Sequence, residues 1–507
     1  MRASAALLVG IDIGTTNLKV VAARPGGRVE AVVRRPMTID RPAVGAAEFN
    51  LDALDRDLVS SLADLVKVLA GRGIDAGAIS GIGIASIGES FVGLDGQDRR
   101  VTPCPTWYDR RTAKRRADWG LGAADWFDIT GMVDDDIYTA YRIDWWRRVG
   151  ADWFSKVTTW LMVADYATFL LSGKKVASPS LAARSGMADR CTGRWSHHIL
   201  DPLGLSEDSL GVLKPSASIA GGLLADIASV TGIAAGTPVI NAGHDHPCAG
   251  LGCGLVDPGR MIDSTGTSEA LKTVVDRPLG FSDVGDGRYD CYPHVVPGRF
   301  LLSGHIPSSG GMIDWLVRTL SGPNPSAETA ALLWHEAAAT PPGSGGVRVG
   351  PFLEGTGAPW NDRGRRADIS FLNAQSTPGA ILRGALEGLA GWLGLNLERF
   401  EAITGTRPDT LTLTGGGARN TLANQIKAAM LERRFAVPDT DEAAGVGAAL
   451  VAGLATGVFA DASEAARLSD VDWQVIEPDA ALASVYRDLT PSIAGHLRSA
   501  QDEVHNG

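Results

Sequence analysis

The stretch Leu7–Ala23, LLVGIDIGTTNLKVVAA, contains two short apolar runs on either side of a turn of small and hydroxyl residues. The first run ends at Ile13 and the second begins at Leu18. Apolar runs of this length that are separated by a glycine-containing turn are typical of two strands joined as a hairpin. The sequence therefore predicts that the fold opens with a β-hairpin.

The turn of this hairpin, Gly14-Thr15-Thr16, is suited to an anion. It offers backbone N–H groups and hydroxyls, Gly14 has no Cβ to block the approach, and Lys19 follows closely. Asp12 lies just before the turn and could hold Mg²⁺, which prefers oxygen ligands, directly or through water. The turn is not a Walker motif, which needs Gly-Lys-Ser/Thr at the start of a helix. We expect it to bind a phosphate with Mg²⁺.

A similar segment recurs in the second half of the chain as Met261–Val275, MIDSTGTSEALKTVV. Gly14 and Gly266 both precede hydroxyl residues and are 252 positions apart (266 minus 14), half of the 507 residues. Such a spacing predicts two similar domains, and we place them at residues 1–250 and 251–507. A second turn, which includes Gly266 and Thr267, could complete a clamp on a polyphosphate. Two short windows can also resemble each other by chance.

Strands and helices alternate along the chain. Leucines recur at helical spacing from Leu51 to Leu69, after Asn50 as an N-cap and before Gly71, which we expect to end the helix in the left-handed conformation. Further strands are expected at Ile79–Ala85, Pro238–Ala242 and Leu411–Thr414, and further helices at Ala380–Phe400 and Thr421–Leu431. The sequence thus predicts an α/β fold.

The amino-acid composition restricts the classes of function that the protein can have. The chain has 45% hydrophobic and 21% charged residues and a net charge of -11 (47 basic minus 58 acidic), without a concentrated basic stretch. This balance indicates a folded protein that binds a small molecule rather than nucleic acid or a membrane surface. The five cysteines include no CxxC pair, and we expect no disulfide. The N-terminal apolar run is too short for a signal peptide, so we expect a cytoplasmic protein.

One long uncharged run extends from Ala443 to Ala460 and is rich in alanine and glycine rather than leucine and isoleucine. This composition predicts a tightly packed, buried helix rather than a membrane span.

The segment Gly243–His246, GHDH, follows an expected strand at the proposed domain boundary and allows two interpretations. His244, Asp245 and His246 could ligate a metal, but the chain has no HExxH motif and no matching third histidine, which disfavours zinc. Alternatively, Asp245 is a base beside a substrate hydroxyl, and the histidines are its hydrogen-bonding neighbours. Alone, a loop aspartate is usually only a turn residue.

Other polar groups follow expected strands, where ligands bind in α/β proteins. Glu89, Trp107 and Asp109 could contact hydroxyls and an apolar carbon face, although a surface salt bridge or a core indole would explain each one singly. The glycines of Gly415–Asn420 lie between a strand and a helix, where a purine or ribose could dock. They do not match GxGxxG, so a dinucleotide site is not supported.

Taken in order, these segments resemble the FGGY carbohydrate kinase family, the sugar and polyol kinases of actin-like (ribonuclease H-like) fold. The matching segments are DIGTTNLK, IASIGESFVGLD, PTWYDRR, TGMVDDDIYTAYRIDWW, GHDH, STGTS, SSGGMIDWL, RGALEGLA and GGGARN. The resemblance implies two actin-like domains with a nucleotide and substrate cleft between them. It also implies ATP-dependent phosphorylation of a hydroxyl of a small sugar, such as a pentulose, or of a short polyol.

The resemblance also implies roles for individual residues. Asp245 would be the catalytic base, and Asp12 and Asp245 would be associated with Mg²⁺. The substrate would be bound by Gly88, Glu89, Trp107, Asp109, Tyr138, Asp245 and His246. ATP would be bound by Gly14, Thr15, Thr16, Lys19, Gly266, Thr267, Gly310, Gly416 and Asn420.

The chain differs from members of this family at positions that contact the substrate in them. Gly88-Glu89 stands where xylulokinase-like pentulose kinases carry Met-His and where glycerol kinases carry Arg-Glu. Arg142 replaces an expected lysine, and Thr356-Gly357 replaces a common Glu-Arg pair. These differences disfavour both D-xylulose and glycerol, although a glycerol-kinase-like polyol kinase stays open. The substrate is left among ketoses and short polyols.

The alternative from another class is an actin-like or heat-shock-type ATPase that acts on a protein partner. It would share both phosphate turns but would not explain the sugar-contact positions in the first half. A degenerate kinase that only senses a sugar is disfavoured by the presence of Asp12, Lys19 and Asp245. A homodimer is compatible with the sequence, which does not fix the oligomeric state.

Overall fold

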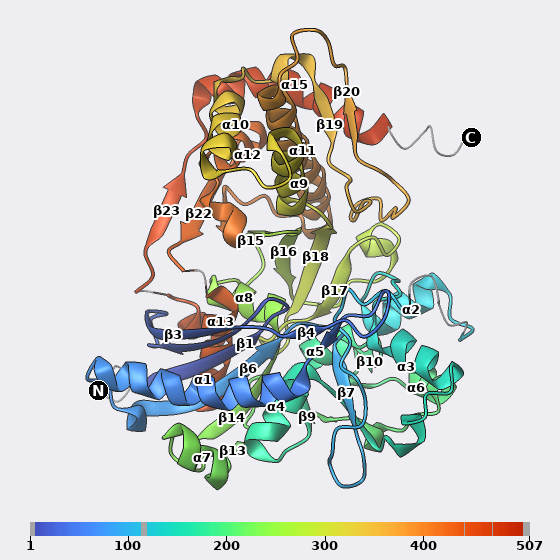
Figure 1. Cartoon of the computed structure of the whole chain (residues 1–507), viewed down its shortest axis with the longest axis vertical. Coiled ribbons are helices and arrows are strands. Elements are labelled where there is room, and N and C mark those ends of the chain that lie inside the picture. Colours follow the sequence, from blue (N-terminus) through green and yellow to red (C-terminus); the bar gives the residue numbers. More distant parts are fainter. Residues whose placement is uncertain (1–5, 113–118, 441, 469, 500–507) are drawn as a thin grey trace. The chain divides into compact units, whose positions relative to one another are not determined.

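The computed structural model describes residues 6–112, 119–440, 442–468 and 470–499 (Figure 1). The chain divides into two compact units, each built from separate segments. The first unit comprises Met1–Pro258, Val274–Leu301 and Glu442–Val471, and the second comprises Gly259–Thr273, Leu302–Asp441 and Asp472–Gly507. The chain therefore returns to the first unit near its C-terminal end.

The first unit contains a six-stranded sheet of order β13-β14-β6-β1-β2-β3. Its strands are β13 (Gly221–Gly222), β14 (Pro238–His244), β6 (Ile79–Ser86), β1 (Leu7–Ile13), β2 (Asn17–Ala23) and β3 (Val29–Pro36). Strand β1 pairs antiparallel with β2 and parallel with β6. The predicted opening hairpin is confirmed, and β1 lies in the middle of the sheet, where all seven of its residues are buried.

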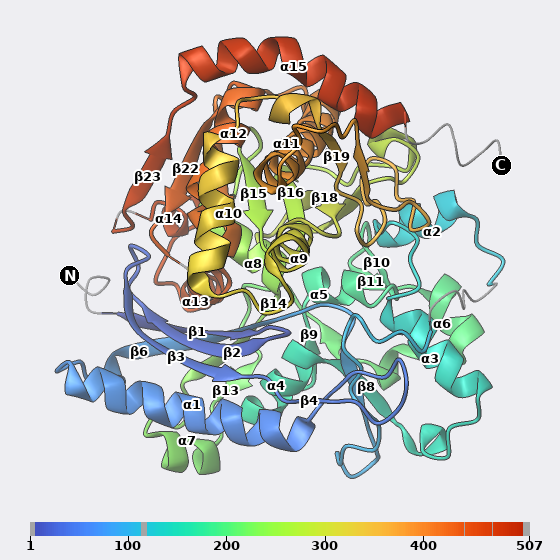
Figure 2. The same ribbon diagram turned by 45° about the horizontal axis from the view of Figure 1, so that its top comes forward.

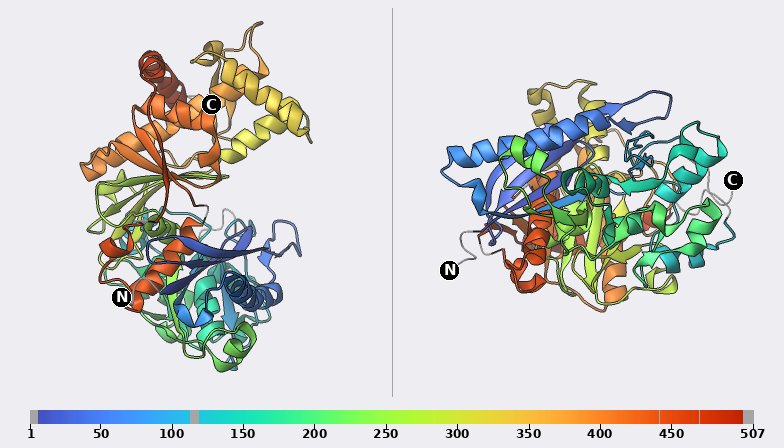
Figure 3. Two further views of the ribbon diagram at one scale, coloured as in Figure 1. Left: turned by 90° about the vertical axis from the view of Figure 1, so that its left-hand side faces the viewer. Right: turned by 90° about the horizontal axis from the view of Figure 1, so that it is seen from below.

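Helix α1 (Leu51–Gly71) runs along β2 and β3 of the same unit, as Figure 3 shows in blue. The Asn50 side chain caps it by accepting a hydrogen bond from the Ala53 N–H (2.9 Å). The expectation that Gly71 adopts the left-handed conformation is wrong. Helical hydrogen bonding continues to the Arg72 N–H, and Gly73 is the left-handed residue, with φ of +71°.

Helix α13 (Ala443–Ala455) packs against β1, β6 and helix α8 (Asp245–Gly252) of the first unit. The contact is so close that a Cβ at Gly10 in β1 would lie 1.8 Å from the Gly445 carbonyl oxygen. Small residues on both surfaces are therefore required, which confirms the predicted buried helix, although it ends at Ala455 rather than Ala460. In the described part of the chain, no helix is long and apolar enough to cross a membrane.

The second unit is built on the strand run β18-β16-β15-β21-β22-β23 (Figure 2). These strands are β18 (Phe300–Ile306), β16 (Glu269–Val275), β15 (Met261–Thr265), β21 (Thr410–Thr414), β22 (Arg434–Pro438) and β23 (Trp473–Ile476). Strand β15 pairs antiparallel with β16 and parallel with β21, as β1 does with β2 and β6. The echo between the two halves of the sequence is thus a repeat of one hairpin topology.

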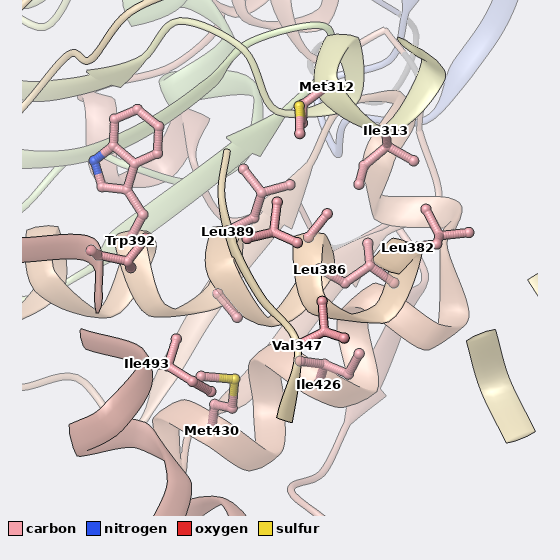
Figure 4. Packing of buried hydrophobic residues seen from close by; sticks show 14 of the residues in the cluster. Met312, Ile313, Val347, Leu382, Leu386, Leu389, Trp392, Ile426, Met430 and Ile493 are labelled. Carbon is pink, nitrogen blue, oxygen red and sulfur yellow. The ribbon is translucent and has the colours of Figure 1, made fainter. Parts of the chain in front are cut away.

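The hydrophobic core of the second unit lies between its helices (Figure 4). The main contributors are α9 (Gly310–Ser321), α11 (Pro378–Thr404), α12 (Thr421–Leu431) and α15 (Ala480–Ser499). Trp392 of α11 is fully buried there and donates its indole N–H to the Ala358 carbonyl (2.7 Å). This core holds α12 and the turn before it against the sheet, where the predicted nucleotide residues lie.

The other elements are shorter or peripheral. They are β4 (Ile39–Asp40), β5 (Glu48–Phe49), β7 (Phe91–Leu94), α2 (Ala123–Thr130), α3 (Thr139–Arg148), β8 (Thr159–Met162), α4 (Val163–Ser172), β9 (Val176–Ala177), α5 (Pro179–Arg184), β10 (Ala188–Asp189), β11 (Arg194–Trp195), α6 (His197–Leu203), β12 (Val212–Leu213), α7 (Ala225–Thr231), β17 (Asp290–Pro293), α10 (Ala327–Ala339), β19 (Arg348–Gly350), β20 (Asp368–Ser370) and α14 (Ala462–Ala465). All five cysteines are free, and all except Cys191 are buried.

Candidate active site

A group of charges lies beside the first turn, and its two carboxylates, Asp12 and Glu442, are buried. Lys19 Nζ lies 3.9 Å from Asp12 Oδ2 and 3.4 Å from Glu442 Oε2, and Glu442 Oε1 accepts a hydrogen bond from Arg34 Nε (2.9 Å). Burial raises the pKa of Asp12 to about 6, against the opposing effect of Lys19. A buried carboxylate with a raised pKa gains more from a cation than an exposed one. Asp12 therefore fits the predicted association with Mg²⁺.

The amides of this turn do not all face a ligand. The Gly14 N–H donates to the Asn17 carbonyl (3.0 Å) and closes the hairpin. Gly14 therefore shapes the turn, and its amide is not available as the sequence suggested. Trp107 lies at the same turn, is 41% exposed, and donates its indole N–H to Thr15 Oγ1 (3.1 Å). Its predicted contact with the substrate stays a prediction.

Asp245 is the first residue of α8, because β14 extends through His244 rather than ending at Ala242 as expected. Asp245 is therefore part of a strand-to-helix junction and not a loop residue. His244 is buried, its Nε2 lies 3.1 Å from Asp245 Oδ1, and its Nδ1 lies 3.2 Å from the Tyr292 hydroxyl. The ring of His246 stacks on that of His244 with centroids 5.0 Å apart. The Asp245 carboxylate thus lies beside a buried histidine ring.

His244, Asp245 and His246 can each direct one ligand atom toward a common point, since these atoms lie within 4.8 Å of one another. Two imidazoles and one carboxylate are a set of donors that suits zinc better than Mg²⁺. However, the two ring nitrogens of His244 already face Tyr292 and Asp245. This arrangement favours the interpretation in which Asp245 is a base and His244 is its neighbour rather than a metal ligand.

Glu89 follows β6 in a left-handed backbone conformation, with φ of +61°. Its Oε1 accepts a hydrogen bond from Arg184 Nε (2.6 Å), and Arg184 Nη1 donates to Asp290 Oδ2 (3.2 Å). The ring of Tyr138 lies under the Arg184 guanidinium, 5.4 Å from Cζ to centroid. Glu89 and Tyr138 thus lie at one buried arginine, which sequence reasoning had not singled out.

Some predicted substrate residues are engaged by the fold. The Tyr138 hydroxyl donates to the Val133 carbonyl (2.8 Å). Asp109 accepts hydrogen bonds from the Ala47 N–H (3.0 Å) and from Arg111 (2.7 Å). These contacts agree with the alternative in which Asp109 forms a salt bridge. The role of Asp109 toward a substrate stays a prediction.

Arg142, the residue that replaces an expected lysine, is fully buried. Its guanidinium donates to the carbonyls of Thr106 (2.7 Å) and Trp107 (2.6 Å), and burial lowers its pKa to about 10. A guanidinium can bond two adjacent carbonyls at once, which a single ammonium does less well. Arg142 therefore holds the loop that carries Trp107.

In the second unit, Gly310 lies directly on the second turn. The Gly310 N–H donates to the Gly266 carbonyl (3.0 Å), and the Ser309 N–H donates to the Thr267 carbonyl (2.9 Å). A Cβ at Gly310 would lie 2.4 Å from the Gly266 oxygen, so no larger residue fits. Gly266, Thr267 and Gly310 therefore form one local structure, as the nucleotide prediction requires.

The predicted adenosine residues lie at the turn before α12. A Cβ at Gly416 would meet no heavy atom within 4 Å, so the backbone there is open to a ligand. Asn420 instead uses its side-chain oxygen to cap α12, accepting from the Ala423 N–H (3.0 Å). Its remaining amide group is the part that could reach a nucleotide.

Behind the second turn lies a buried charge cluster. Lys427 Nζ of α12 bonds Asp263 Oδ2 (2.7 Å), Glu269 Oε1 (3.0 Å) and Thr265 Oγ1 (3.1 Å). Ser309 donates to Glu269 Oε2 (2.7 Å). Burial, with the Glu269 charge, raises the pKa of Asp263 to about 7. The cluster ties the turn to α12 and to the start of α9.

Sequence reasoning missed several residues that surround the predicted ones. They are Arg184, Asp290, Tyr292, Lys427 and Glu442. Glu442 immediately precedes the Gly/Ala-rich helix, and Lys427 lies in the helix after GGGARN, so position offered some indication of these two. Arg184, Asp290 and Tyr292 lie in segments that carry no motif, and only the fold brings them to Glu89 and His244.

Comparison with known proteins gives the family. The N-terminal domain of the FGGY family of carbohydrate kinases matches residues 7–252, and its C-terminal domain matches residues 262–456. A xylulose kinase from Bacillus subtilis (strain 168) is 26% identical over 497 residues, which cover 97% of each chain. A gluconokinase from the same organism is 26% identical over 464 residues, covering 89% of this chain and 88% of the other.

Among solved structures, xylulose kinase from Rhodospirillum rubrum matches with a TM-score of 0.87 at 23% identity, covering 99% of this chain and 100% of the other. This likeness confirms the mixed α/β two-domain fold. The two family matches together cover most of the chain, and the protein belongs to the FGGY family of carbohydrate kinases.

The protein is accordingly a sugar or polyol kinase, and kinases of this family use ATP. The alternative of an actin-like or heat-shock-type ATPase that acts on a protein partner is not favoured.

Proposed function

We propose that the protein transfers the γ-phosphoryl group of ATP to a hydroxyl of a ketose, such as a pentulose, or of a short polyol, with Asp245 as the general base. The observation that carries this proposal is the position of Asp245 at the start of α8, next to a buried histidine that is itself held by Tyr292. An aspartate at such a junction can accept a proton from a hydroxyl that binds beside it.

The other assignments follow from the two turns. The phosphates of ATP would contact Thr15, Thr16, Lys19, Gly266 and Thr267. Gly310, Gly416 and Asn420 would lie near the nucleoside, and Gly14 would shape the first turn. Residues 1–250 would contribute the first phosphate turn and most of the sugar contacts, and residues 251–507 would contribute most of the nucleotide contacts. A cytoplasmic location and a homodimer are part of the same proposal.

Asp12 and Asp245 would hold Mg²⁺, since both offer the oxygen ligands that this ion prefers. Bound Mg²⁺ would neutralise charge on the transferred phosphoryl group. The chain's own residues would do the rest. Lys19 attracts the phosphates, Glu89 and His246 orient the sugar, and Asp245 takes the proton as the new O–P bond forms and the bond to ADP breaks.

The direct test is a screen that couples ADP formation to a signal, using three- to seven-carbon ketoses, polyols and sugar acids. We expect sugar-dependent ADP formation with one or a few of these compounds. ATP hydrolysis that no sugar increases, but that a protein partner does, would contradict the proposal.

We expect Glu89→Ala to lower kcat/KM by about 1.5 to 3 kcal/mol, mainly through KM, because a charged hydrogen-bond acceptor for the sugar is lost. ATP affinity should not change. The variant should also melt earlier, because Arg184 loses one of its two carboxylate partners. Steady-state kinetics and thermal unfolding measure both effects.

Asp64→Ala is a matched control, since Asp64 pairs with Lys67 and Arg35 at the surface of the first unit. Such surface pairs contribute about 0 to 1 kcal/mol to stability and nothing to catalysis. If Glu89→Ala melted earlier but kept its KM, the sugar would bind elsewhere.

A further inference from the structure

Arg184 is held between two carboxylates in the interior of the first unit. Its Nε donates to Glu89 Oε1 (2.6 Å), its Nη2 contacts the same oxygen, and its Nη1 donates to Asp290 Oδ2 (3.2 Å). None of these three side chains is more than 17% exposed. Arg184 also lies over the rings of Tyr138 and Tyr292. The guanidinium is thus fixed in place and already neutralised.

The same arginine explains the glycine at position 88. A Cβ at Gly88 would lie 3.0 Å from both Cβ and Cγ of Arg184 and 3.2 Å from its Nε. A Cβ at position 88 would therefore press on the side chain of Arg184, which would have to shift by a few tenths of an ångström. Position 88 therefore carries no side chain that could contact the substrate, and the space beside it is occupied by the buried Arg184 of α5.

The cluster is connected to Asp245 through short contacts within the first unit. Ser180, in the same helix as Arg184, accepts a hydrogen bond from the His244 N–H (3.1 Å). Tyr292, whose ring faces Arg184, lies 3.2 Å from His244 Nδ1, and His244 Nε2 lies 3.1 Å from Asp245. A sugar whose hydroxyl reaches Asp245 would therefore extend toward this cluster.

The charges of the cluster do not favour an anionic ligand. Glu89 and Asp290 contribute two negative charges and Arg184 one positive charge, a net charge of -1. Asp245 adds a further carboxylate. The guanidinium of Arg142, which Glu89 also influences electrostatically, already donates to the carbonyls of Thr106 and Trp107. A carboxylate placed here would meet like charge in a poorly solvated site, which is costly.

The cluster does have a place for a hydroxyl. Glu89 bonds Arg184 through Oε1 alone, and no group of the described residues donates to its Oε2. Asp290 Oδ1 accepts from the Val133 N–H (2.7 Å), so this carboxylate is used on both oxygens. A carboxylate accepts but does not donate, so Glu89 Oε2 suits the O–H donor of a neutral sugar.

We propose that Arg184 is a specificity-determining residue: with Glu89 and Asp290 it forms a negatively charged subsite that binds an uncharged ketose or polyol and rejects sugar acids. This inference rests on the proposed function, because it assumes that the sugar lies beside Glu89. It gives the substrate class a physical cause, and it separates two kinds of sugar that occur in the names of relatives, xylulose and gluconate.

The test compares compounds of equal chain length that differ in charge: D-xylulose and xylitol with D-xylonate, and D-fructose and sorbitol with D-gluconate. Isothermal titration calorimetry without nucleotide gives the ratio of affinities, and coupled kinetics gives the ratio of kcat/KM. We expect the full-length protein to favour the best uncharged compound by about 10²-fold or more, as like-charge repulsion in an enclosed site implies.

The decisive variant is Asp290→Asn, which keeps the shape and the acceptor for the Val133 N–H but removes one negative charge. We expect the preference for uncharged sugars to narrow by about tenfold, since Arg184 then has a charge to share with a sugar acid. Asp208→Asn, which removes an exposed carboxylate from the same unit, should leave the ratio unchanged.

Three results would overturn the proposal: a wild-type preference for the sugar acids, no saturable binding of any uncharged compound, or equal ratios for Asp290→Asn and Asp208→Asn. Failure of the proposed general base gives a different result. In that case Asp245→Asn would turn over normally while the ratio of affinities still followed the charge at position 290.

Discussion

Asp245→Asn should lower kcat by roughly 10² to 10⁴-fold, the usual effect of losing a general base, while ATP still binds. Asparagine has the volume of aspartate, and its side-chain oxygen can still face His244 Nε2, which lies 3.1 Å from Asp245 Oδ1 in the native protein. The variant therefore keeps the junction between β14 and α8 but has no group that can accept a proton. Single-turnover phosphoryl transfer, measured with the best substrate of the screen, reports this step directly.

A suitable control is Asp226→Asn, because Asp226 is also a first-turn carboxylate of a short helix, α7, in the same unit. It lies on an exposed face, and its loss should leave kcat unchanged. Near-normal turnover of Asp245→Asn would exclude Asp245 as the base. A large loss of ATP affinity together with kcat would instead indicate that Asp245 acts mainly through Mg²⁺.

Much of the fold could be predicted because it depends on local patterns. The hairpin of β1 and β2 follows from two apolar runs around a glycine, and α1 follows from leucines at helical spacing after Asn50. The buried helix α13 follows from its alanine and glycine content. The errors were also local. The left-handed residue after α1 is Gly73 rather than Gly71, and β14 continues to His244, because hydrogen bonds and strand pairing extend past the residues that look like boundaries.

The site was predicted in part for the same reason. Asp12 lies near the end of a recognisable strand, Glu89 and Asp245 follow such strands, and all three belong to motifs that resemble a family. Arg184 and Asp290, by contrast, lie 95 and 201 residues after Glu89 (184 and 290 minus 89) in segments without a motif. Their importance comes from charge pairing in a buried place, which depends on the tertiary fold. For Glu89, the sequence predicted an acceptor for hydroxyls, and the structure shows in addition that Arg184 neutralises its charge.

Lys427→Met should destabilise the protein by about 3 to 5 kcal/mol, because it leaves Asp263 and Glu269 buried without their cation. The side chains of both carboxylates have no exposed surface in the native protein. Methionine fills similar space, so the loss is one of charge pairing rather than of volume. Lys67→Met, which removes one partner of a surface pair with Asp64, should cost less than about 1 kcal/mol.

The pH dependence identifies the cause of this loss. Asp263 has a raised pKa of about 7 in the native state, and removal of Lys427 takes away an interaction that lowers it. A carboxyl with a raised native pKa binds more protons folded than unfolded, so stability falls as pH rises through the native pKa. The loss of unfolding free energy in Lys427→Met, relative to the native protein, should therefore be larger at pH 8 than at pH 6. Chemical denaturation at the two pH values measures it.

The same variant tests whether the cluster supports the nucleotide site. Lys427 joins α12 to the second turn through Asp263 and Thr265, and Glu269 joins that turn to Ser309 at the start of α9. Loss of the Lys427 ammonium should weaken ATP binding, while the KM for the sugar stays the same. The double variant Lys427→Met with Asp263→Asn removes one unpaired charge as well, and it should recover part of the stability even if the single variant does not fold. Unchanged ATP affinity in the folded double variant, with sugar binding impaired instead, would mean that the second turn does not contact the nucleotide.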